Sequence, residues 1–295
     1  RLRCDWSSDV CSSDLMLGAV VSFTSMAVAG REISVELNTF ELMMYRSAIG
    51  FFIVNLLILK MGGYSQVKTD RMGMHFKRNV FHFAGQNLWF YGIVVIPFSE
   101  LVALEFTSPI WVIILAPFFL GETMTKARIF AAICGFIGVL VVAQPGVIEL
   151  GAGHAAGALA AIFFALNVIY TRQISRFESV LSVLFWMTLL QFIMGFALSI
   201  LGGIPIPSTQ GIKWVIVVAI AGLAAHYCLT SALSLAPAGI VAPMEFIRLP
   251  VIALIGMVFY DESFVWAVMI GGLFILGGNF INIRSEQHKT KPASP

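Results

Sequence analysis

Long apolar runs separated by short polar segments make up the chain from about residue 15 onwards. A helix of about 20 apolar residues crosses the ~30 Å hydrocarbon core of a bilayer, and the runs have roughly that length. The pattern therefore predicts an all-α polytopic membrane protein with ten transmembrane helices. The predicted spans are 15–30, 39–60, 79–97, 101–120, 126–144, 155–173, 180–201, 212–235, 240–260 and 263–283.

Composition supports the same class. Of the 295 residues, 59% are hydrophobic and only 12% are charged, whereas soluble domains carry about 25% charged residues. The mean hydropathy of +0.90 excludes a soluble globular protein. The four cysteines show neither a disulfide framework nor the spacing of metal ligands, so we expect no metal and no cofactor.

The two ends of the chain differ from the rest. Residues 1–15, RLRCDWSSDVCSSDL, are polar, contain a near-repeat and lack the apolar core of a signal peptide. They resemble sequence translated from a sequencing adapter, and we expect them not to belong to the native protein. Residues 284–295 are also polar, and we expect them to form a cytoplasmic tail.

Positive charges concentrate in alternate loops. The loop between the second and third predicted spans carries Lys60, Lys68, Arg71, Lys77 and Arg78. The loops on the opposite side contain only two positively charged residues, Arg31 and Lys213. By the positive-inside rule both termini are cytoplasmic, as an even number of spans requires. We therefore expect a multi-pass protein of the cytoplasmic (inner) membrane.

One stretch of the chain occurs twice. Residues 101–122 are LVALEFTSPIWVIILAPFFLGE, and residues 241–262 are VAPMEFIRLPVIALIGMVFYDE. Placing the first copy on the second aligns Glu105 with Glu245, and we call this shift along the chain the repeat offset. Each glutamate is soon followed by a proline, which removes a backbone donor and kinks a helix.

The repetition extends to the two halves of the chain. The predicted repeats are 16–144 and 155–283, and each contains five helices. Because five is odd, the second copy is inserted upside down relative to the first. Two inverted five-helix repeats are a recurring architecture of secondary transporters, whose substrate site lies near the midplane between the halves.

Five motifs carry a family resemblance. In the first half they are ELMMYR, PIWVIILAPFFLGE and GFIGVLVV, and in the second half APMEFIRLPVIALIGMVFYDE and GGLFILGG. Together they resemble the EamA-type repeat of the drug/metabolite transporter superfamily, over residues 16–285. Gly121-Glu122 becomes Asp261-Glu262 in the second half, and at both helix ends we expect the glutamate to cap a helix or form a loop salt bridge.

The resemblance implies a permease without ATPase machinery, for amino acids, S-adenosylmethionine, riboflavin or other small metabolites. We expect a secondary transporter that works by alternating access, with proton coupling left open. Its partners would be a small-molecule substrate and the lipid bilayer, and no nucleic acid. The alternatives are an intramembrane enzyme or a non-transporting membrane partner protein. An enzyme would need a nucleophile–base set or metal ligands, and the spans hold neither H-E-x-x-H nor paired aspartates.

Four charged residues fall inside the predicted spans: Arg46, Glu105, Glu245 and Arg248. A charge at a helix centre costs roughly 2.5–3.5 kcal/mol, so each must find a partner or face water. Glu245 and Arg248 are three residues apart on one helix face and can pair, while Arg46 and Glu105 lie at similar depth and can pair with each other. These residues either fix helix packing as ion pairs or bind a charged substrate, and Glu245 with Arg248 is the strongest expectation for binding.

Polar residues within the spans complete the predicted substrate-binding set. They are Gln86, Asn87, Tyr91, Asn167, His226, Tyr227 and Thr230. On a helix, residues four apart share a face, so the third and eighth spans can each present an inward polar face. An intramembrane histidine such as His226 either hydrogen-bonds to a neighbouring helix or titrates near neutral pH and couples transport to protons.

Small residues are frequent in the fifth and tenth predicted spans, 126–144 and 263–283. Glycine and alanine let helix backbones approach closely in a membrane. The two spans are therefore expected either to pack tightly within the chain or to form the face of a homodimer.

Overall fold

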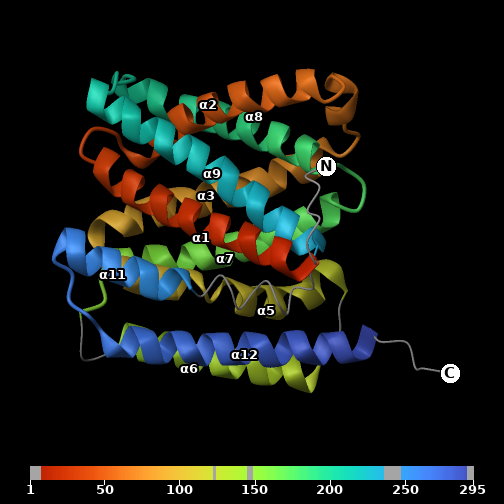
Figure 1. The fold of residues 1–295 in the computed structure, drawn as a ribbon, viewed down its shortest axis with the longest axis vertical. Coiled ribbons are helices and arrows are strands. Elements are labelled where there is room, and N and C mark those ends of the chain that lie inside the picture. Colours follow the sequence, from red (N-terminus) through yellow and green to blue (C-terminus); the bar gives the residue numbers. More distant parts are fainter. Residues whose placement is uncertain (1–7, 122–123, 145–148, 236–246, 291–295) are drawn as a thin grey trace.

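The computed structural model describes residues 8–121, 124–144, 149–235 and 247–290, and within these ranges it contains helices and no β-strand (Figure 1). Two short 3-10 turns, η1 (Tyr64–Val67) and η2 (Ile200–Gly202), accompany the α-helices. The α-helices are α1 (Ser8–Ile33), α2 (Thr39–Lys60), α3 (Met72–Val95), α4 (Phe98–Glu105), α5 (Ser108–Leu120), α6 (Lys126–Ala143), α7 (Ala152–Ile174), α8 (Val180–Ser199), α9 (Thr209–Leu235), α11 (Arg248–Tyr260) and α12 (Trp266–Thr290).

The predicted all-α polytopic class is confirmed. Among the described residues, seven helical segments are long and apolar enough to cross a membrane, with α4 and α5 counted as one segment, and α11 and most of α12 are shorter apolar helices. The number of ten transmembrane helices stays a prediction. Helix α1 begins inside the segment 1–15, and α12 continues into the predicted tail 284–295.

The predicted span 101–120 is broken into two helices. Helix α4 ends at Glu105, and α5 begins at Ser108 with Pro109 in its first turn. Proline has no backbone N–H, so it fits the first turn of a new helix, whereas in a helix interior it removes a hydrogen bond and favours a kink or break. The position of Pro109 therefore accounts for the break, which places Glu105 at a helix end inside the predicted span.

The second repeat has the same local geometry. Helix α11 begins at Arg248, which the repeat offset aligns with Ser108 at the start of α5, and both helices contain 13 residues. Both helices end in the left-handed conformation, at Gly121 (φ 66°) and Asp261 (φ 52°). The sequence repetition is thus matched by the backbone of the two halves.

Helices from the two halves interleave. Helix α1 packs against α9, α3 against α7, α2 against α8, α4 against α11, and α6 against α12. At the repeat offset α1 corresponds to α7 and α3 to α9, so the first two contacts exchange with each other. The α2–α8 and α6–α12 contacts join equivalent helices, and the α4–α11 contact joins α4 to the counterpart of α5. The beginning of α1 and the end of α12 lie at the same end of the bundle, on the right of Figure 1. This is the contact pattern of two halves related by a two-fold axis.

The hydrophobic core contains side chains from both halves. Phe98, Ile252 and Ile275 are fully buried within it. On the outside, large apolar side chains remain exposed, such as Phe118 (82%) and Phe259 (74%). A soluble monomer rarely exposes so much contiguous apolar surface, whereas a bundle surrounded by lipid has no reason to hide it.

The small residues of the fifth and tenth predicted spans serve a contact within the chain. A Cβ atom added to Gly138 on α6 would lie 2.6 Å from the carbonyl oxygen of Gly271 on α12, and the reverse distance is also 2.6 Å. A Cβ on Gly278 would lie 2.8 Å from the carbonyl oxygen of Ala131. The two backbones therefore touch directly. The homodimer expected through these spans stays a prediction.

Glu178 holds together the end of the bundle where the α2–α3 and α7–α8 loops meet. Its carboxylate accepts hydrogen bonds from the Thr69 hydroxyl and from Ser182 Oγ (2.7 Å), and it pairs with His75 Nε2 (2.6 Å). Burial by itself raises the pKa of Glu178, but these hydrogen bonds outweigh it, so the pKa is lowered from its ordinary value. The charged form is therefore the one that the fold stabilises.

We expect this contact to make stability depend on pH. A carboxylate with a lowered pKa contributes stability above its unfolded pKa of about 4.3, and the contribution disappears as the pH falls through the folded pKa. Since a hydrogen bond to a charged group contributes about 1.5–3 kcal/mol, Glu178→Gln should melt several degrees below the wild type at pH 7. Melting temperatures in detergent should converge once the pH is low enough to protonate Glu178 in the folded protein. The exposed neighbour Asp70 offers the control Asp70→Asn, which should melt like the wild type; a constant gap for Glu178→Gln at all pH values would contradict the prediction.

Candidate functional site

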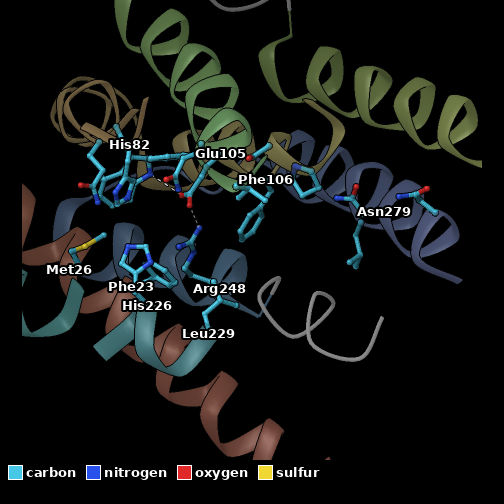
Figure 2. Close-up of a pocket in the computed structure, with 18 of the residues that line it drawn as sticks. Phe23, Met26, His82, Glu105, Phe106, His226, Leu229, Arg248 and Asn279 are labelled. Carbon is cyan, nitrogen blue, oxygen red and sulfur yellow. Dashed lines mark hydrogen bonds and ion pairs between the residues drawn. The ribbon is translucent and has the colours of Figure 1, made fainter. Parts of the chain in front are cut away.

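A cavity of about 280 Å³ lies between the two halves. Its lining comes from α1, α3, α4, α5, α7, α9, α11 and α12, so both repeats contribute. Small-molecule sites have volumes of about 300–1,000 Å³, and this cavity is close to the lower bound. The break between α4 and α5 and the start of α11 both face it, as Figure 2 shows for Glu105, Phe106 and Arg248. Broken helices at the repeat interface are where transporters place their substrate sites.

Glu105 and Arg248 form an ion pair in the middle of the lining (Figure 2). Arg248 Nη2 lies 2.7 Å from Glu105 Oε1, and Trp89 Nε1 donates to Glu105 Oε2 at 2.9 Å. Glu105 is the last residue of α4, where the helix dipole is negative, and Arg248 is the first residue of α11, where the dipole is positive. Each charged side chain is therefore next to a partial charge of its own sign. The pair offsets both unfavourable interactions and joins the two repeats.

Aromatic rings surround the guanidinium group of Arg248. Its Cζ atom lies 5.0 Å from the ring centre of Phe23 and 4.9 Å from that of Phe106. A cation within about 6 Å of a ring centre is attracted by the negative face of the ring. The two rings and the Glu105 carboxylate together hold Arg248 in one orientation.

Arg46 is buried but does not line the cavity. With the amide oxygen of Gln86 turned toward it, that oxygen accepts from Arg46 Nη1 at 3.1 Å and from Nη2 at 3.3 Å. Within the described part of the chain no ion pair joins Arg46 to Glu105, so the expected pairing of these two residues is wrong. The reason is that Glu105 is already paired with Arg248 of the other repeat.

Two imidazole rings meet at the other end of the cavity. The rings of His82 on α3 and His226 on α9 are 5.4 Å apart and nearly perpendicular. The Nδ1 atom of His82 lies 2.7 Å from Gln191 Nε2, and the His226 ring contacts the Phe23 ring edge-on at 5.8 Å. Both histidines line the cavity, one from each repeat.

The structure brings together five of the residues predicted to bind substrate: Glu105, Arg248, Gln86, Asn167 and His226 all line the cavity. They come from five different helices, α4, α11, α3, α7 and α9. Their role in binding stays a prediction. Glu245 lies outside the described residues, as does the side chain of Thr230.

The remaining predicted residues do not reach the cavity. Tyr91 and Tyr227 are 41% and 47% exposed on the outside of the bundle. Asn87 is buried, and its Nδ2 donates to the carbonyl oxygen of Phe83 on its own helix at 2.7 Å. Each helix residue is turned by about 100° from the one before, so Asn87 and Tyr227 point away from the face of their neighbours Gln86 and His226.

Some lining residues were missed by the sequence analysis. His82 lies four residues before Gln86 on the same face of α3, and Asn279 and Asn282 lie three apart on α12. A usable signal existed, because two amides three residues apart in an apolar run share one helix face. The many glycines of the same span favoured the interpretation that this helix serves packing, so the two asparagines were not considered as binding residues.

The end of the bundle remote from the α12 part of the cavity is closed by Arg31. Its Nη1 lies 2.5 Å from Glu262 Oε1, and its Nη2 donates to the carbonyl oxygen of Ile96 at 2.9 Å. Glu262 in turn accepts from the backbone N–H of Phe98 at 3.0 and 3.1 Å, at the start of α4. The expected capping and salt-bridge role of Glu262 is confirmed, and Glu122 lies outside the described residues.

Other contacts between the halves lie at the same end. His154 Nε2 is 2.9 Å from Glu100 Oε2, and the Tyr260 hydroxyl donates to Glu32 Oε1 at 2.7 Å. By contrast, the α12 residues that line the cavity are in the second half of that helix, toward Thr290. The cavity is therefore sealed at the end where α1 finishes.

Comparisons with known proteins place the chain in a family. The model of the EamA-like transporter family matches residues 14–144 and again residues 151–284. A riboflavin transporter of Rhizobium johnstonii is 26% identical over 82% of this chain and 80% of its own length. An S-adenosylmethionine uptake transporter of Rickettsia felis is 25% identical over 91% of both chains.

A solved crystal structure has the same fold. The superposition covers 95% of this chain and 99% of the chain in that structure, with a TM-score of 0.66 and a sequence identity of 16%. The two family matches together span most of the chain, and they confirm the resemblance to the drug/metabolite transporter superfamily. The protein belongs to the EamA-like transporter family.

Proposed function

We propose that this protein is a secondary transporter that moves a small metabolite across the cytoplasmic membrane. The observation that carries the proposal is the cavity between the repeats, whose lining includes the Glu105–Arg248 pair. Glu105 belongs to the first repeat and Arg248 to the second, so any movement of one repeat against the other changes the shape and the charge of the cavity. Coupling of this kind is what alternating access requires.

The proposed architecture has ten transmembrane helices in two inverted five-helix repeats, with both termini in the cytoplasm. Three observations support it. The helix contacts exchange under the repeat offset, α1 starts and α12 ends at the same end of the bundle, and Lys and Arg concentrate in the loops at that end. By the positive-inside rule that end faces the cytoplasm.

Alternating access is proposed from the distribution of contacts along the bundle. Arg31, Glu32 and Glu100 of the first repeat bind Glu262, Tyr260 and His154 of the second at one end. The cavity extends toward the other end along α12. The arrangement therefore corresponds to a state closed on the outer side, and breaking the outer contacts would begin the opposite opening.

The relatives suggest the first solutes to test. Two of them are named as riboflavin and S-adenosylmethionine transporters, and both solutes contain a flat heteroaromatic ring. The cavity offers the rings of Phe23, Trp89 and Phe106 for stacking against such a solute. We therefore propose a metabolite with an aromatic ring as the substrate.

A flux assay in proteoliposomes tests the proposal. Purified protein should mediate saturable uptake of labelled riboflavin or S-adenosylmethionine, and Glu105→Gln should lower the rate at least tenfold. The exposed loop residue Glu149 provides the control Glu149→Gln, which should transport like the wild type. If folded wild-type protein moves neither solute, nor any component of a labelled metabolite extract, the proposed function is wrong.

Proton coupling is the finer part of the proposal. Glu105 and Arg248 belong to different repeats, so a movement that separates the repeats also separates these two charges. The imidazoles of His82 and His226 lie in the same cavity. Uptake that is driven by a pH gradient and abolished by a protonophore would support coupling, and uptake that is indifferent to both would exclude it.

A further inference from the structure

Several polar atoms in the cavity have no hydrogen-bond partner. Among the described residues, the buried unpartnered atoms of the lining are Asn167 Oδ1, Arg248 Nε, Asn279 Oδ1, Asn279 Nδ2 and Asn282 Oδ1. Leaving a buried polar group unpaired costs free energy, so native proteins contain few of them. Their concentration around one cavity indicates that something other than the protein completes these hydrogen bonds.

The amides on α12 form a distinct part of the cavity. Asn279 is 5% exposed, and Asn282 follows it by three residues, so the two share one face of the helix. Figure 2 shows Asn279 at the end of the cavity opposite His82, with Glu105 and Phe106 between them. We call Asn279 and Asn282 the amide subsite.

The fold does not need amides at these places. At the repeat offset, Asn279 corresponds to Val139 and Asn282 to Val142 in the first repeat. Val142 is 1% exposed and packs in the core of the protein. The first repeat therefore folds with apolar side chains at the two equivalent positions. Helix packing does not require the two amides of the second repeat.

The charges of the cavity limit what the amide subsite can bind. Among the described lining residues, the carboxylate of Glu105 and the guanidinium of Arg248 neutralise each other. The groups left without a partner are then mostly amides, each of which offers donors and acceptors side by side. An uncharged ligand with the same alternation of N–H and C=O groups matches them, whereas an ion would find its counter-charge already occupied.

We propose that the amide subsite binds the imide edge of a neutral, planar heterocycle, such as a pyrimidinedione ring. This inference rests on the proposed function of the cavity as a transport site. Asn279 donates to a carbonyl oxygen of the ring and accepts from its N–H, and Asn282 Oδ1 accepts from a hydroxyl group carried elsewhere on the ligand, such as one on the ribityl chain of riboflavin. Phe106 and Phe280, which line the same part of the cavity, pack against the faces of the ring. Riboflavin has such an edge and no charge, whereas S-adenosylmethionine carries a sulfonium and a zwitterionic group.

Binding of riboflavin to the full chain in detergent tests the amide subsite. Asn279→Leu replaces the amide by an apolar side chain with the same branching and number of heavy atoms, and we expect it to weaken riboflavin binding at least tenfold. The melting temperature of the free protein should stay the same or rise, because an unpaired buried amide has been replaced by an apolar group. A purely structural role for Asn279 predicts the reverse, a lower melting temperature.

A ligand analogue identifies the group that is recognised. Riboflavin methylated at the imide nitrogen lacks the N–H donor, so it should bind the wild type at least tenfold more weakly than riboflavin. It should lose nothing further on Asn279→Leu. Thr24 is buried on α1 with an unpartnered hydroxyl outside the cavity, and Thr24→Val should leave binding unchanged.

The outcomes separate this inference from the proposed function. If the wild type moves riboflavin and Asn279→Leu moves it equally well, the amide subsite is wrong and the transporter remains. If the wild type moves S-adenosylmethionine but neither binds nor moves riboflavin, the neutral heterocycle is wrong and the transporter remains. If no solute moves, both are wrong.

Discussion

Replacing Glu105 with glutamine is expected to destabilise the protein by about 3–5 kcal/mol, the cost of leaving one partner of a buried ion pair uncompensated. Arg248 is only 5% exposed, and its Nη2 lies 2.7 Å from the carboxylate. In the variant the guanidinium would stay charged and buried beside a neutral amide. Thermal unfolding in detergent should show a melting temperature many degrees below that of the wild type.

The double variant Glu105→Gln/Arg248→Met decides whether the loss comes from the pair. Removing both charges takes away the uncompensated ion, so the double variant should recover most of the stability that Glu105→Gln loses. It should still fail to transport, because the charges that join the repeats are gone. If Glu105→Gln melts like the wild type, or if the double variant is no more stable than the single one, the pair does not hold the repeats together.

The second large effect is expected at the contact between α6 and α12. Gly271→Ala would place a methyl group 2.6 Å from the carbonyl oxygen of Gly138, which is shorter than the normal contact distance between a carbon and an oxygen atom. Because this oxygen belongs to the backbone, it cannot rotate away as a side chain could. Overpacking of this kind costs about 1–3 kcal/mol. The melting temperature of Gly271→Ala in detergent should therefore fall by several degrees, and Gly138→Ala should have a similar effect.

The same helix contains a matched control. Among the described residues, no atom outside the adjacent backbone of α12 lies within 4 Å of the place where a Cβ on Gly277 would be, so Gly277→Ala meets open space. Alanine is favoured over glycine in a helix interior by about 0.5–1 kcal/mol, and this variant should melt at or above the wild-type temperature. Equal effects of Gly271→Ala and Gly277→Ala would show that the two helices are not in direct backbone contact.

Much of the fold could be predicted because it depends on local properties of the chain. The length of an apolar run decides whether a helix can cross the bilayer, and Pro109 is suited to the first turn of a new helix because it has no backbone N–H. The repeat offset aligned Ser108 with Arg248, and α5 and α11 begin at these two residues. Repetition of sequence produced repetition of backbone.

The candidate site was predicted less completely. The cost of a charge in the membrane required Glu105 and Arg248 to have partners. Similar depth in the membrane allowed Arg46 to pair with Glu105, and the three-residue spacing on one helix allowed Glu245 to pair with Arg248. The structure pairs Glu105 with Arg248, which lies in the other repeat and far away in the sequence. Tyr91 was predicted from its place in a polar segment, and the turn of the helix carries it to the outer surface.

The amino-acid sequence alone determined which elements are present: apolar helices, a duplicated half, a few intramembrane charges, and glycines that permit close contact. Each of these follows from neighbouring residues or from comparison of the chain with itself. The packing of the two halves decided the rest. It brought the end of α4 next to the start of α11 and placed the glycines of α6 and α12 in contact with the opposite backbone. It also left the side chain of Asn279 without a hydrogen-bond partner in a cavity. These contacts depend on distances between helices remote in sequence, and no local pattern encodes such distances.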